Sequence, residues 1–356
     1  MRIAFDVSPL SHERTGVNNY LRGSLRGLAE AAPDDEIVAF APTSLNGSAA
    51  IRAALSGIDV DLRLLPLPAS HALRTAWSLA RRPAAERWLG AFDALHFSDW
   101  LFPPQRAGVR ATTIHDIVPH HHPEWTTART AAMHERKYRN AARTCDVIFA
   151  NSTFTADDFS GVYSFPRERM LVAHPGIGEE FTADGQASDL GLPYLLTVAT
   201  LEPRKNLETL VRAFEQLSDP DLVLAVAGGA GWGEQPQLDR RGIVRLGRVT
   251  DEELARLYRG AAAVVYPSRF EGFGMPVTEA MACGAPVVAS SHPSLDEASG
   301  AAALRADPED PEAIAHAIRT ALSKRDELSA LGLAHAAMFS WRRTGEIFLE
   351  GYRRFA

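Results

Sequence analysis

The chain has 356 residues, which exceeds one ordinary hydrophobic core and predicts two domains. With 46% hydrophobic and 23% charged residues, it has the composition of a soluble globular protein. The net charge of −7 at pH 7 gives no electrostatic basis for binding nucleic acid, and two cysteines are too few for a disulfide framework. The N-terminal MRIAFDVSPL lacks a signal-peptide core, and no run reaches the ~20 apolar residues that span a bilayer, so we expect a cytoplasmic protein.

Strand-like and helix-like segments alternate along the chain, which predicts an α/β protein with parallel sheets covered by helices on both faces. The strands of the first half are predicted at 3–7, 36–40, 60–64, 94–97, 111–114 and 147–150. Those of the second half are predicted at 194–198, 222–227, 243–246, 263–266 and 286–289. A stretch of glycines and small polar residues at 179–193 is the expected linker, so we predict domains at 1–178 and 194–339 and an amphipathic helix at 340–356.

The first strand leads into a predicted helix with Val17, Leu21, Leu25 and Leu28 on its apolar face. Gly16 precedes this face, at the carboxyl end of the strand, where doubly wound sheets bind their ligands. Because glycine has no Cβ, a phosphate could approach the backbone there. An ordinary turn glycine is the alternative interpretation.

A basic segment with tryptophans follows at 71–90. Its arginines and tryptophans are Arg74, Arg81, Arg82, Arg87, Trp77 and Trp88. A basic helix with tryptophans can lie on an anionic membrane, so a peripheral contact with the inner face of a membrane is one interpretation. We favour the other, a solvated basic face over two core aromatics, because Pro83 interrupts the helix.

His115 and Asp116 follow the strand predicted at 111–114, so they lie at the ligand-binding edge of the first sheet. Asp116 is expected either to orient the His115 ring or to cap the next turn. The histidines at 120–122 cannot all point at one ion because they are consecutive, and no carboxylate pattern completes a ligand set. We therefore predict no metal site.

The turn after the strand at 194–198 contains Glu202, Arg204 and Lys205 and leads into a helix. Two adjacent cations at the carboxyl end of a strand, beside a helix N-terminus, suit a dianionic diphosphate. An exposed charged turn is the alternative. Gly228, after the strand at 222–227, could pack closely against a flat ligand or belong to a simple loop.

The stretch at 261–290 predicts a strand, a glycine loop, a helix that begins near Pro276, and a second strand. Such a loop aims backbone N–H groups at one point, where the helix dipole favours an anion. The residues expected around this point are Gly272, Phe273, Gly274 and Met275. Glu271 and Glu279 frame the loop with seven residues between them. For two isolated glutamates, a non-functional explanation fits as well as a binding role: Glu271 would be a solvated loop residue, and Glu279 would suit the helix dipole.

This Glu-x7-Glu pattern, within PSRFEGFGMPVTEAMACGAPVVAS, resembles the signature of the retaining nucleotide-sugar glycosyltransferases of family 4. The resemblance covers nearly the whole chain and implies the GT-B fold, two Rossmann-like domains facing across a cleft, with the helix at 340–356 joined to the first domain. It implies a hexosyltransferase that moves a sugar from a nucleoside diphosphate to a hydroxyl, in glycan, polysaccharide or glycolipid synthesis. The segments LEPRKNLETLVRAF and IHDIVPHHHPEW look most like bacterial mannosyl- and rhamnosyltransferases, which favours GDP-mannose as the donor.

The resemblance also implies roles for single residues. Arg204 and Lys205 would hold the departing diphosphate, Glu271 the sugar hydroxyls and Glu279 the ribose hydroxyls. His115 would reach the transferred sugar. The other residues expected to bind the donor are Gly16, Gly228, Arg248, Val249 and the loop at 272–275. The family usually has a Gly-Gly pair where this chain has Gly16 alone, a departure from the pattern.

The expected partners are a nucleotide-sugar donor and a sugar or lipid-linked acceptor, with no cofactor and no metal. Two other functions are open for such a chain. It could be a nucleotide-sugar epimerase or hydrolase of the same fold, or a non-catalytic nucleotide-sugar binding protein.

Overall fold

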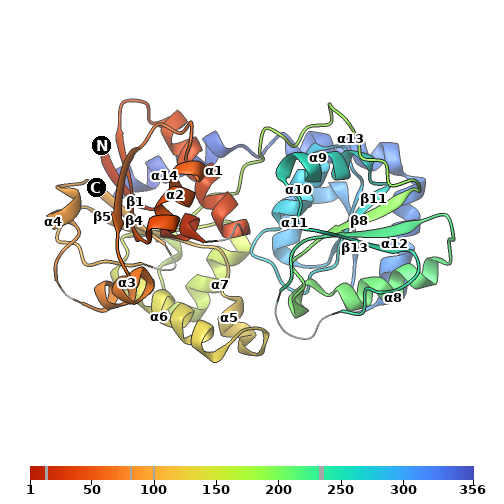
Figure 1. Ribbon diagram of the computed structural model, residues 1–356, viewed down its shortest axis with the longest axis horizontal. Helices are drawn as coiled ribbons and strands as arrows, with labels where there is room; N and C mark the ends of the chain where they lie inside the picture. The colour runs from red at the N-terminus through yellow and green to blue at the C-terminus, as the bar shows by residue number, and fades with distance from the viewer. Residues whose placement is uncertain (13–14, 81, 99–100, 232–235) are drawn as a thin grey trace. The chain divides into compact units, whose positions relative to one another are not determined.

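The computed structural model describes residues 1–12, 15–80, 82–98, 101–231 and 236–356 (Figure 1). The chain forms two compact units. The first contains Met1–His120, Arg129–Gly176 and Ser340–Ala356, and the second contains His121–Ala128 and Ile177–Phe339. Each unit is built on its own parallel sheet.

The first unit has a seven-stranded sheet in the order β3-β2-β1-β4-β5-β6-β7. The strands are β1 (Arg2–Asp6), β2 (Glu36–Thr43), β3 (Asp61–Pro66), β4 (Ala94–Phe97), β5 (Val109–Ile114), β6 (Val147–Ala150) and β7 (Met170–Val172). The helices are α1 (Gly16–Ala31), α2 (Leu45–Ala54), α3 (Ser70–Leu79), α4 (Glu86–Leu89), α5 (Val118–His121), α6 (Ala128–Thr144), α7 (Thr153–Tyr163) and α14 (Trp341–Phe355). The six strands predicted here are confirmed, and β7 was not predicted.

The second unit has a six-stranded sheet in the order β10-β9-β8-β11-β12-β13. The strands are β8 (Tyr194–Val198), β9 (Val223–Ala227), β10 (Ile243–Gly247), β11 (Ala263–Tyr266), β12 (Val287–Ser290) and β13 (Ala303–Ala306). The helices are α8 (Leu207–Leu217), α9 (Asp251–Gly260), α10 (Met275–Ala282), α11 (Pro293–Ser299), α12 (Pro311–Ser323) and α13 (Arg325–Ala336). The five strands predicted here are confirmed, and β13 was not predicted.

Both sheets are parallel throughout and reverse their strand order beside the first strand, β1 or β8. Helices cover both faces of such sheets, so the central strands are short apolar runs with every residue buried, as in β6 (VIFA) and β11 (AVVY). The reversal of strand order opens a space at the carboxyl edge of the sheet, where ligands bind in doubly wound folds. The predicted site residues follow the ends of β1, β5, β8, β9, β10 and β11, at this edge of their own sheet.

The terminal helix α14 packs lengthwise on α1, and Figure 1 shows the two side by side in the first unit. This close approach requires glycine at position 27 of α1, since an added Cβ would lie 1.7 Å from the carbonyl oxygen of Trp341. Of the buried stripe predicted for α14, Phe348 and Tyr352 are fully buried, whereas Trp341 and Ile347 are partly buried. Helix α14 is therefore an integral part of the first unit.

The basic segment at 71–90 is less exposed to solvent than predicted. It forms α3 and the short α4, and Arg74 is only 2% exposed. The Arg74 Nη2 lies 3.3 Å from His12 Nε2, and the charge of Arg74 faces the buried Asp6. Burial raises the pKa of Asp6, although hydrogen bonds from Ser8 and Ser98 oppose the rise.

The solvated interpretation is thus wrong for Arg74, because the helix turns this residue toward the sheet. The two tryptophans do pack against the core, as predicted, and both are partly buried. Arg82 and Arg87 are exposed, and Arg81 lies outside the described residues.

Candidate active site

The two adjacent cations lie in a short 3-10 turn, Pro203–Lys205, between β8 and α8. Asn206 ends this turn in the left-handed conformation (φ 57°), which Asn tolerates better than most residues. Its side chain donates hydrogen bonds to the carbonyl oxygens of Pro267 (3.1 Å) and Pro308 (2.6 Å). These bonds fix the turn against the segment that follows β11.

Glu271 joins both cations through one buried carboxylate. Its Oε2 accepts a hydrogen bond from Arg204 Nη1 at 2.9 Å, and its Oε1 accepts one from Lys205 Nζ at 2.6 Å. Glu202 lies on the other side of Arg204, with 3.0 Å between Glu202 Oε1 and Arg204 Nη2. The structure therefore brings together three of the residues expected to act on the donor.

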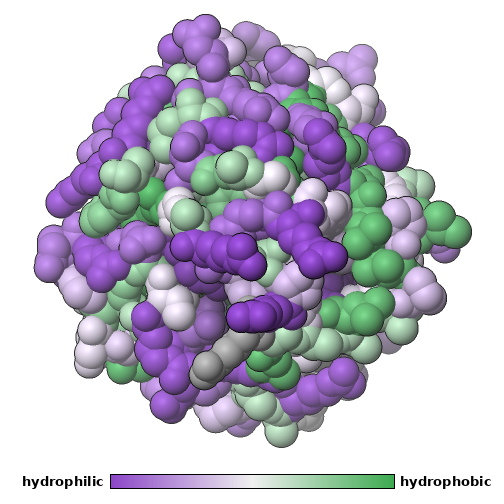
Figure 2. Space-filling view, turned by 90° about the vertical axis from the view of Figure 1, so that its left-hand side faces the viewer, coloured by the Kyte–Doolittle hydropathy of each residue, from purple (hydrophilic) through white to green (hydrophobic). Residues whose placement is uncertain are grey.

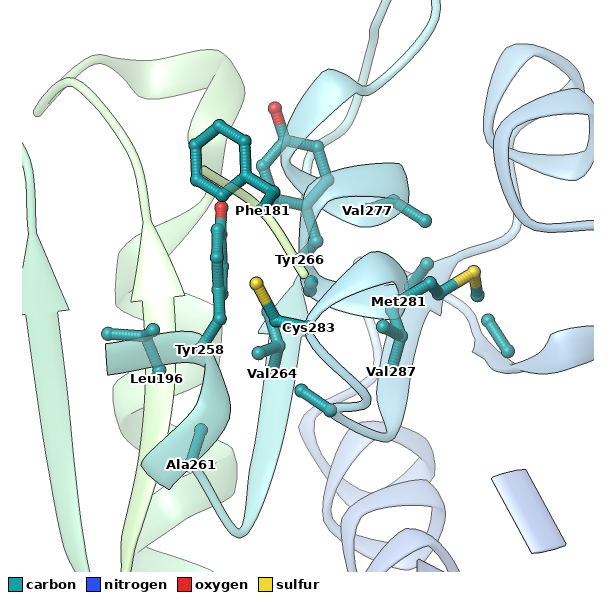
Figure 3. Packing of buried hydrophobic residues seen from close by; sticks show 14 of the residues in the cluster. Phe181, Leu196, Tyr258, Ala261, Val264, Tyr266, Val277, Met281, Cys283 and Val287 are labelled. Atoms are coloured by element: carbon teal, nitrogen blue, oxygen red, sulfur yellow. The ribbon is translucent and has the colours of Figure 1, made fainter. Parts of the chain in front are cut away.

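Tyr266, the last residue of β11, completes this cluster and was not predicted. Lys205 Nζ donates a hydrogen bond to the Tyr266 hydroxyl at 2.7 Å, and the hydroxyl donates one to Glu271 Oε1 at 3.0 Å. Figure 3 shows that the hydroxyls of Tyr266 and Tyr258 both point away from Ala261, toward the same end of the apolar cluster. The available signal was a tyrosine at the carboxyl end of an otherwise aliphatic strand.

Charge and burial act in opposition in this cluster. Burial lowers the pKa of Lys205, and the charge of Arg204 lowers it further, while Glu271 raises it. Burial alone would raise the pKa of Glu271, but Arg204 and Lys205 outweigh burial and lower it to about 2. Burial and Glu271 raise the pKa of Tyr266 well above its ordinary value. At neutral pH Glu271 is thus a carboxylate and Tyr266 a neutral hydroxyl.

The glycine loop leads directly into α10. Gly274 is the residue before the helix, with φ 103°, and Met275 is its first residue, so Pro276 stands at the second helical position. The carbonyl oxygen of Glu271 accepts a hydrogen bond from Ser294 Oγ at 2.8 Å, which ties the start of the loop to α11. The loop therefore approaches the positive end of a helix dipole, as predicted.

Two other residues of this segment are held by the protein itself. Glu279, on α10, is buried, and its Oε2 accepts a hydrogen bond from the Tyr258 hydroxyl at 3.3 Å. The Phe273 ring is buried and packs against Phe339, with 5.5 Å between ring centroids. A contact of Phe273 with a ligand would therefore come from its backbone, whereas Gly272 and Gly274 have only backbone to offer.

A cavity of about 270 Å³ lies at the ends of β9 and β10. Its lining includes Leu201, Gly228, Gly229, Leu238, Arg245 and Arg248. Gly228 has φ 145°, and an added Cβ would lie 1.9 Å from the carbonyl oxygen of Ala199, so only glycine fits there. The Arg248 side chain lies against Gly229, and Val249 is partly buried against the core of the second unit. Gly228 and Arg248 thus line the same cavity, and Val249 is the residue that follows Arg248 in the chain.

In the first unit, His115 directly follows β5. Its ring meets the Tyr20 ring edge-on, with 5.0 Å between centroids, and its carbonyl oxygen accepts a hydrogen bond from Thr155 Oγ1 at 3.4 Å. The Asp116 carboxylate accepts a hydrogen bond from the Val118 backbone N–H at 3.0 Å, so it caps the next turn. Of the two roles predicted for Asp116, this one is confirmed.

Gly16 is the first residue of α1 and is exposed. An added Cβ would meet no atom within 4 Å in the part of the chain that the structure describes. Its φ lies outside the positive range that favours glycine, so a turn does not require glycine here.

Among the described residues, no group of three His, Cys, Asp or Glu side chains is arranged to hold a metal ion. His122 instead pairs with Glu124 at 3.0 Å and stacks on Trp125 at 3.8 Å. Within the same residues, no helix has the length and apolar character needed to cross a membrane.

Two family models match consecutive parts of the chain. Residues 14–181 match "Glycosyltransferase Family 4", and residues 179–334 match "Glycosyl transferases group 1". The O-antigen chain mannosyltransferase B of Escherichia coli is 29% identical over 99% of this chain and 100% of its own length.

Solved structures agree in fold. Sucrose-phosphate synthase from Thermosynechococcus elongatus superimposes with a TM-score of 0.71 at 20% identity, covering 99% of this chain and 98% of that one. Anabaena HepE in complex with UDP gives a TM-score of 0.70 at 17% identity, covering 98% of each chain. Taken with the two family models, these findings show that the chain belongs to the family 4 glycosyltransferases and has their two-domain GT-B fold.

Proposed function

We propose that this glycosyltransferase moves mannose from GDP-mannose to a hydroxyl acceptor with retention of the anomeric configuration. The observation that carries the proposal is the buried cluster of Arg204, Lys205 and Glu271 at the carboxyl edge of the second sheet, beside the glycine loop that opens α10. The choice of mannose is supported by similarity to a mannosyltransferase along its full length. The alternative donors carry uracil, thymine or adenine.

In the proposed reaction, the bond between the anomeric carbon and the β-phosphate oxygen breaks, and its electron pair stays on that oxygen. The acceptor oxygen bonds to the anomeric carbon from the same face, and its proton passes to the departing phosphate. Arg204, Lys205 and the N-terminal end of α10 would stabilise the negative charge that develops on the diphosphate. We propose that this charge stabilisation needs no metal.

The remaining residues are proposed to hold the donor. Glu279 would accept hydrogen bonds from the ribose hydroxyls, and Glu271 from hydroxyls of the sugar. The cavity beside Gly228 and Arg248 would take the base, with backbone contacts from the residues around Val249. For Gly16 and His115 we keep the roles that family membership suggests, a contact with the donor phosphate and one with the transferred sugar.

A ligand screen tests the donor. A ligand that binds only the folded state raises the unfolding temperature. At a concentration of 100 times its Kd, it adds ~2.7 kcal/mol to the free energy of unfolding. We expect GDP and GDP-mannose to stabilise the protein more than the diphosphates and sugar nucleotides of uracil, thymine and adenine. A stronger shift with another base would contradict the proposed donor, and no shift with any of them would contradict a nucleotide-sugar enzyme.

Product analysis tests the reaction itself. With an acceptor alcohol present, we expect a glycoside whose anomeric configuration, read by NMR, matches that of the donor. Free sugar formed regardless of the acceptor would indicate a hydrolase, and an altered nucleotide sugar would indicate an epimerase. Binding without any turnover would indicate a non-catalytic binding protein.

We also propose that the acceptor is a sugar or a lipid-linked sugar and that the protein touches the inner face of a membrane. Support comes from α3, where Leu73 and Leu79 are 44% and 59% exposed and are followed by the exposed Arg82 and Arg87. Figure 2 shows hydrophobic residues gathered toward the right-hand margin of a mainly hydrophilic face. At low salt the protein should sediment with anionic vesicles and not with zwitterionic ones, and a Leu73→Ser/Leu79→Ser variant should sediment less. Equal recovery in the supernatant with both lipids would overturn the membrane contact.

A further inference from the structure

We infer that Tyr266 is a positioning residue for Lys205, whose hydroxyl holds the Lys205 ammonium at the diphosphate when Glu271 turns to the donor sugar. This inference rests on the proposed function of Arg204, Lys205 and Glu271. Tyr266 itself touches neither the sugar nor the phosphate in this account. It acts through Lys205.

The Lys205 ammonium has three N–H groups, and two of them donate hydrogen bonds within the protein. One is donated to the Tyr266 hydroxyl at 2.7 Å and one to Glu271 Oε1 at 2.6 Å. These are the hydrogen-bond partners of its ammonium within the described chain, so the third N–H remains for a phosphate oxygen. Lys205 is only 8% exposed, and water therefore offers little compensation when either partner is lost.

Two sets of partners compete for the carboxylate of Glu271. In the structure it satisfies Arg204 and Lys205, whereas the proposed reaction needs it at the sugar hydroxyls. When it turns to the sugar, the buried ammonium loses its hydrogen-bonded carboxylate beside the like charge of Arg204. A second acceptor that stays in place is then required.

The Tyr266 hydroxyl meets this requirement without cancelling charge. It is a neutral acceptor, so the full positive charge of Lys205 remains available to the diphosphate. It sits at the end of β11, between β8 and β12 in the sheet, on a ring that is 2% exposed and packed in the apolar cluster of Figure 3. The ring therefore has little freedom to follow Glu271 when the latter moves.

The lysine content of the chain makes a direct test practicable. Lysine occurs three times, at Lys137, Lys205 and Lys324, so protein labelled with ¹⁵N only at lysine side chains gives three ammonium signals. Lys205→Met and Lys324→Met assign the signals, and the exposed Lys324 serves as an internal reference. The titration of Lys205 is then followed in wild type and in Tyr266→Phe, which retains the ring.

We expect Lys205 to titrate about 1 pH unit lower in Tyr266→Phe, because a hydrogen bond to a charged group is lost. The shift should be larger in a Glu271→Gln background, where the tyrosine is the remaining strong partner. The matched control is Tyr194→Phe. It removes a buried hydroxyl that bonds the Leu257 carbonyl at 2.7 Å, at the opposite end of the sheet, and should leave Lys205 unchanged.

Kinetics provide the second readout. In Tyr266→Phe we expect kcat to fall ~10-fold or more, KM for GDP-mannose to change less than ~3-fold, and the alkaline limb of kcat to move to lower pH with the Lys205 titration. An unchanged Lys205 titration would overturn the inference, as would a kcat loss matched by Tyr194→Phe. If wild type transfers no sugar at all, the proposed function fails, while the lysine titration still decides whether Tyr266 holds Lys205.

Discussion

Replacing Lys205 by Met removes the ammonium and keeps most of the buried stem of the side chain. A group that stabilises charge in the transition state contributes ~2.7–4 kcal/mol, so sugar transfer should fall by ~10²–10³. The fold should survive. Glu271 retains its hydrogen bond with Arg204 at 2.9 Å, so its buried charge still has a partner. We therefore expect the unfolding free energy to fall by ~1–3 kcal/mol, less than the ~3–5 kcal/mol lost when a buried charge is left with no partner.

The assay is the release of nucleoside diphosphate with time, measured beside the thermal unfolding of the same preparation. The matched control is Lys324→Met, since Lys324 is exposed and lies 3.5 Å from Glu327, a surface pair worth ~0–1 kcal/mol. We expect wild-type rate and stability for this control. A Lys205→Met rate within threefold of wild type would refute the role of the cluster in stabilising the leaving group.

Three further predictions follow from the second unit. Gly228→Ala should lose ~2–4 kcal/mol of unfolding free energy in urea, because φ is 145° and the new Cβ would lie 1.9 Å from a carbonyl oxygen. The control is Gly161→Ala on α7, where an added Cβ meets no atom of the described residues within 4 Å, and it should be neutral or gain up to ~1 kcal/mol. Equal effects of the two substitutions would contradict the strain argument. Because the folded pKa of Glu271 is about 2, below its ordinary value of 4.5, its contribution to stability is present above pH 4.5 and is lost as the pH falls toward 2. In Glu271→Gln, the unfolding free energy should therefore depend less on pH between 4.5 and 2. The same pH dependence in the variant and in wild type would contradict the lowered pKa of Glu271. Glu279→Gln should weaken GDP binding ~10-fold or more in calorimetry if its carboxylate holds the ribose, and wild-type affinity would rule that contact out.

Sequence reasoning worked best for the buried strands. Continuous apolar runs such as 147–150 and 263–266 are the observed β6 and β11, because a strand covered on both faces must be apolar throughout. The strands that were missed, β7 and β13, lie at sheet edges, are three and four residues long, and are only partly buried. Their sequences therefore carry a weaker pattern.

For the candidate site, the sequence predicted which residues gather but not how they pair. The motif Glu-x7-Glu and the Arg-Lys turn indicated the cluster, yet the hydrogen bond between Lys205 and Tyr266 joins residues 61 positions apart and depends on β8 lying beside β11. The burial of Arg74 was missed for a similar reason. Helical spacing shows which residues share a face, but the face that meets the sheet is set by the neighbouring elements.

The packing of α14 on α1 has a consequence for biosynthesis. Residues 1–176 leave the ribosome long before Trp341–Phe355, so the surface at Gly23 and Gly27 that Trp341 covers in the folded protein stays uncovered while the second unit is being made. The unit whose synthesis begins first is thus the unit whose fold is completed last. A fragment ending at Gly176 would need this helix supplied in trans as a separate peptide to close its apolar surface.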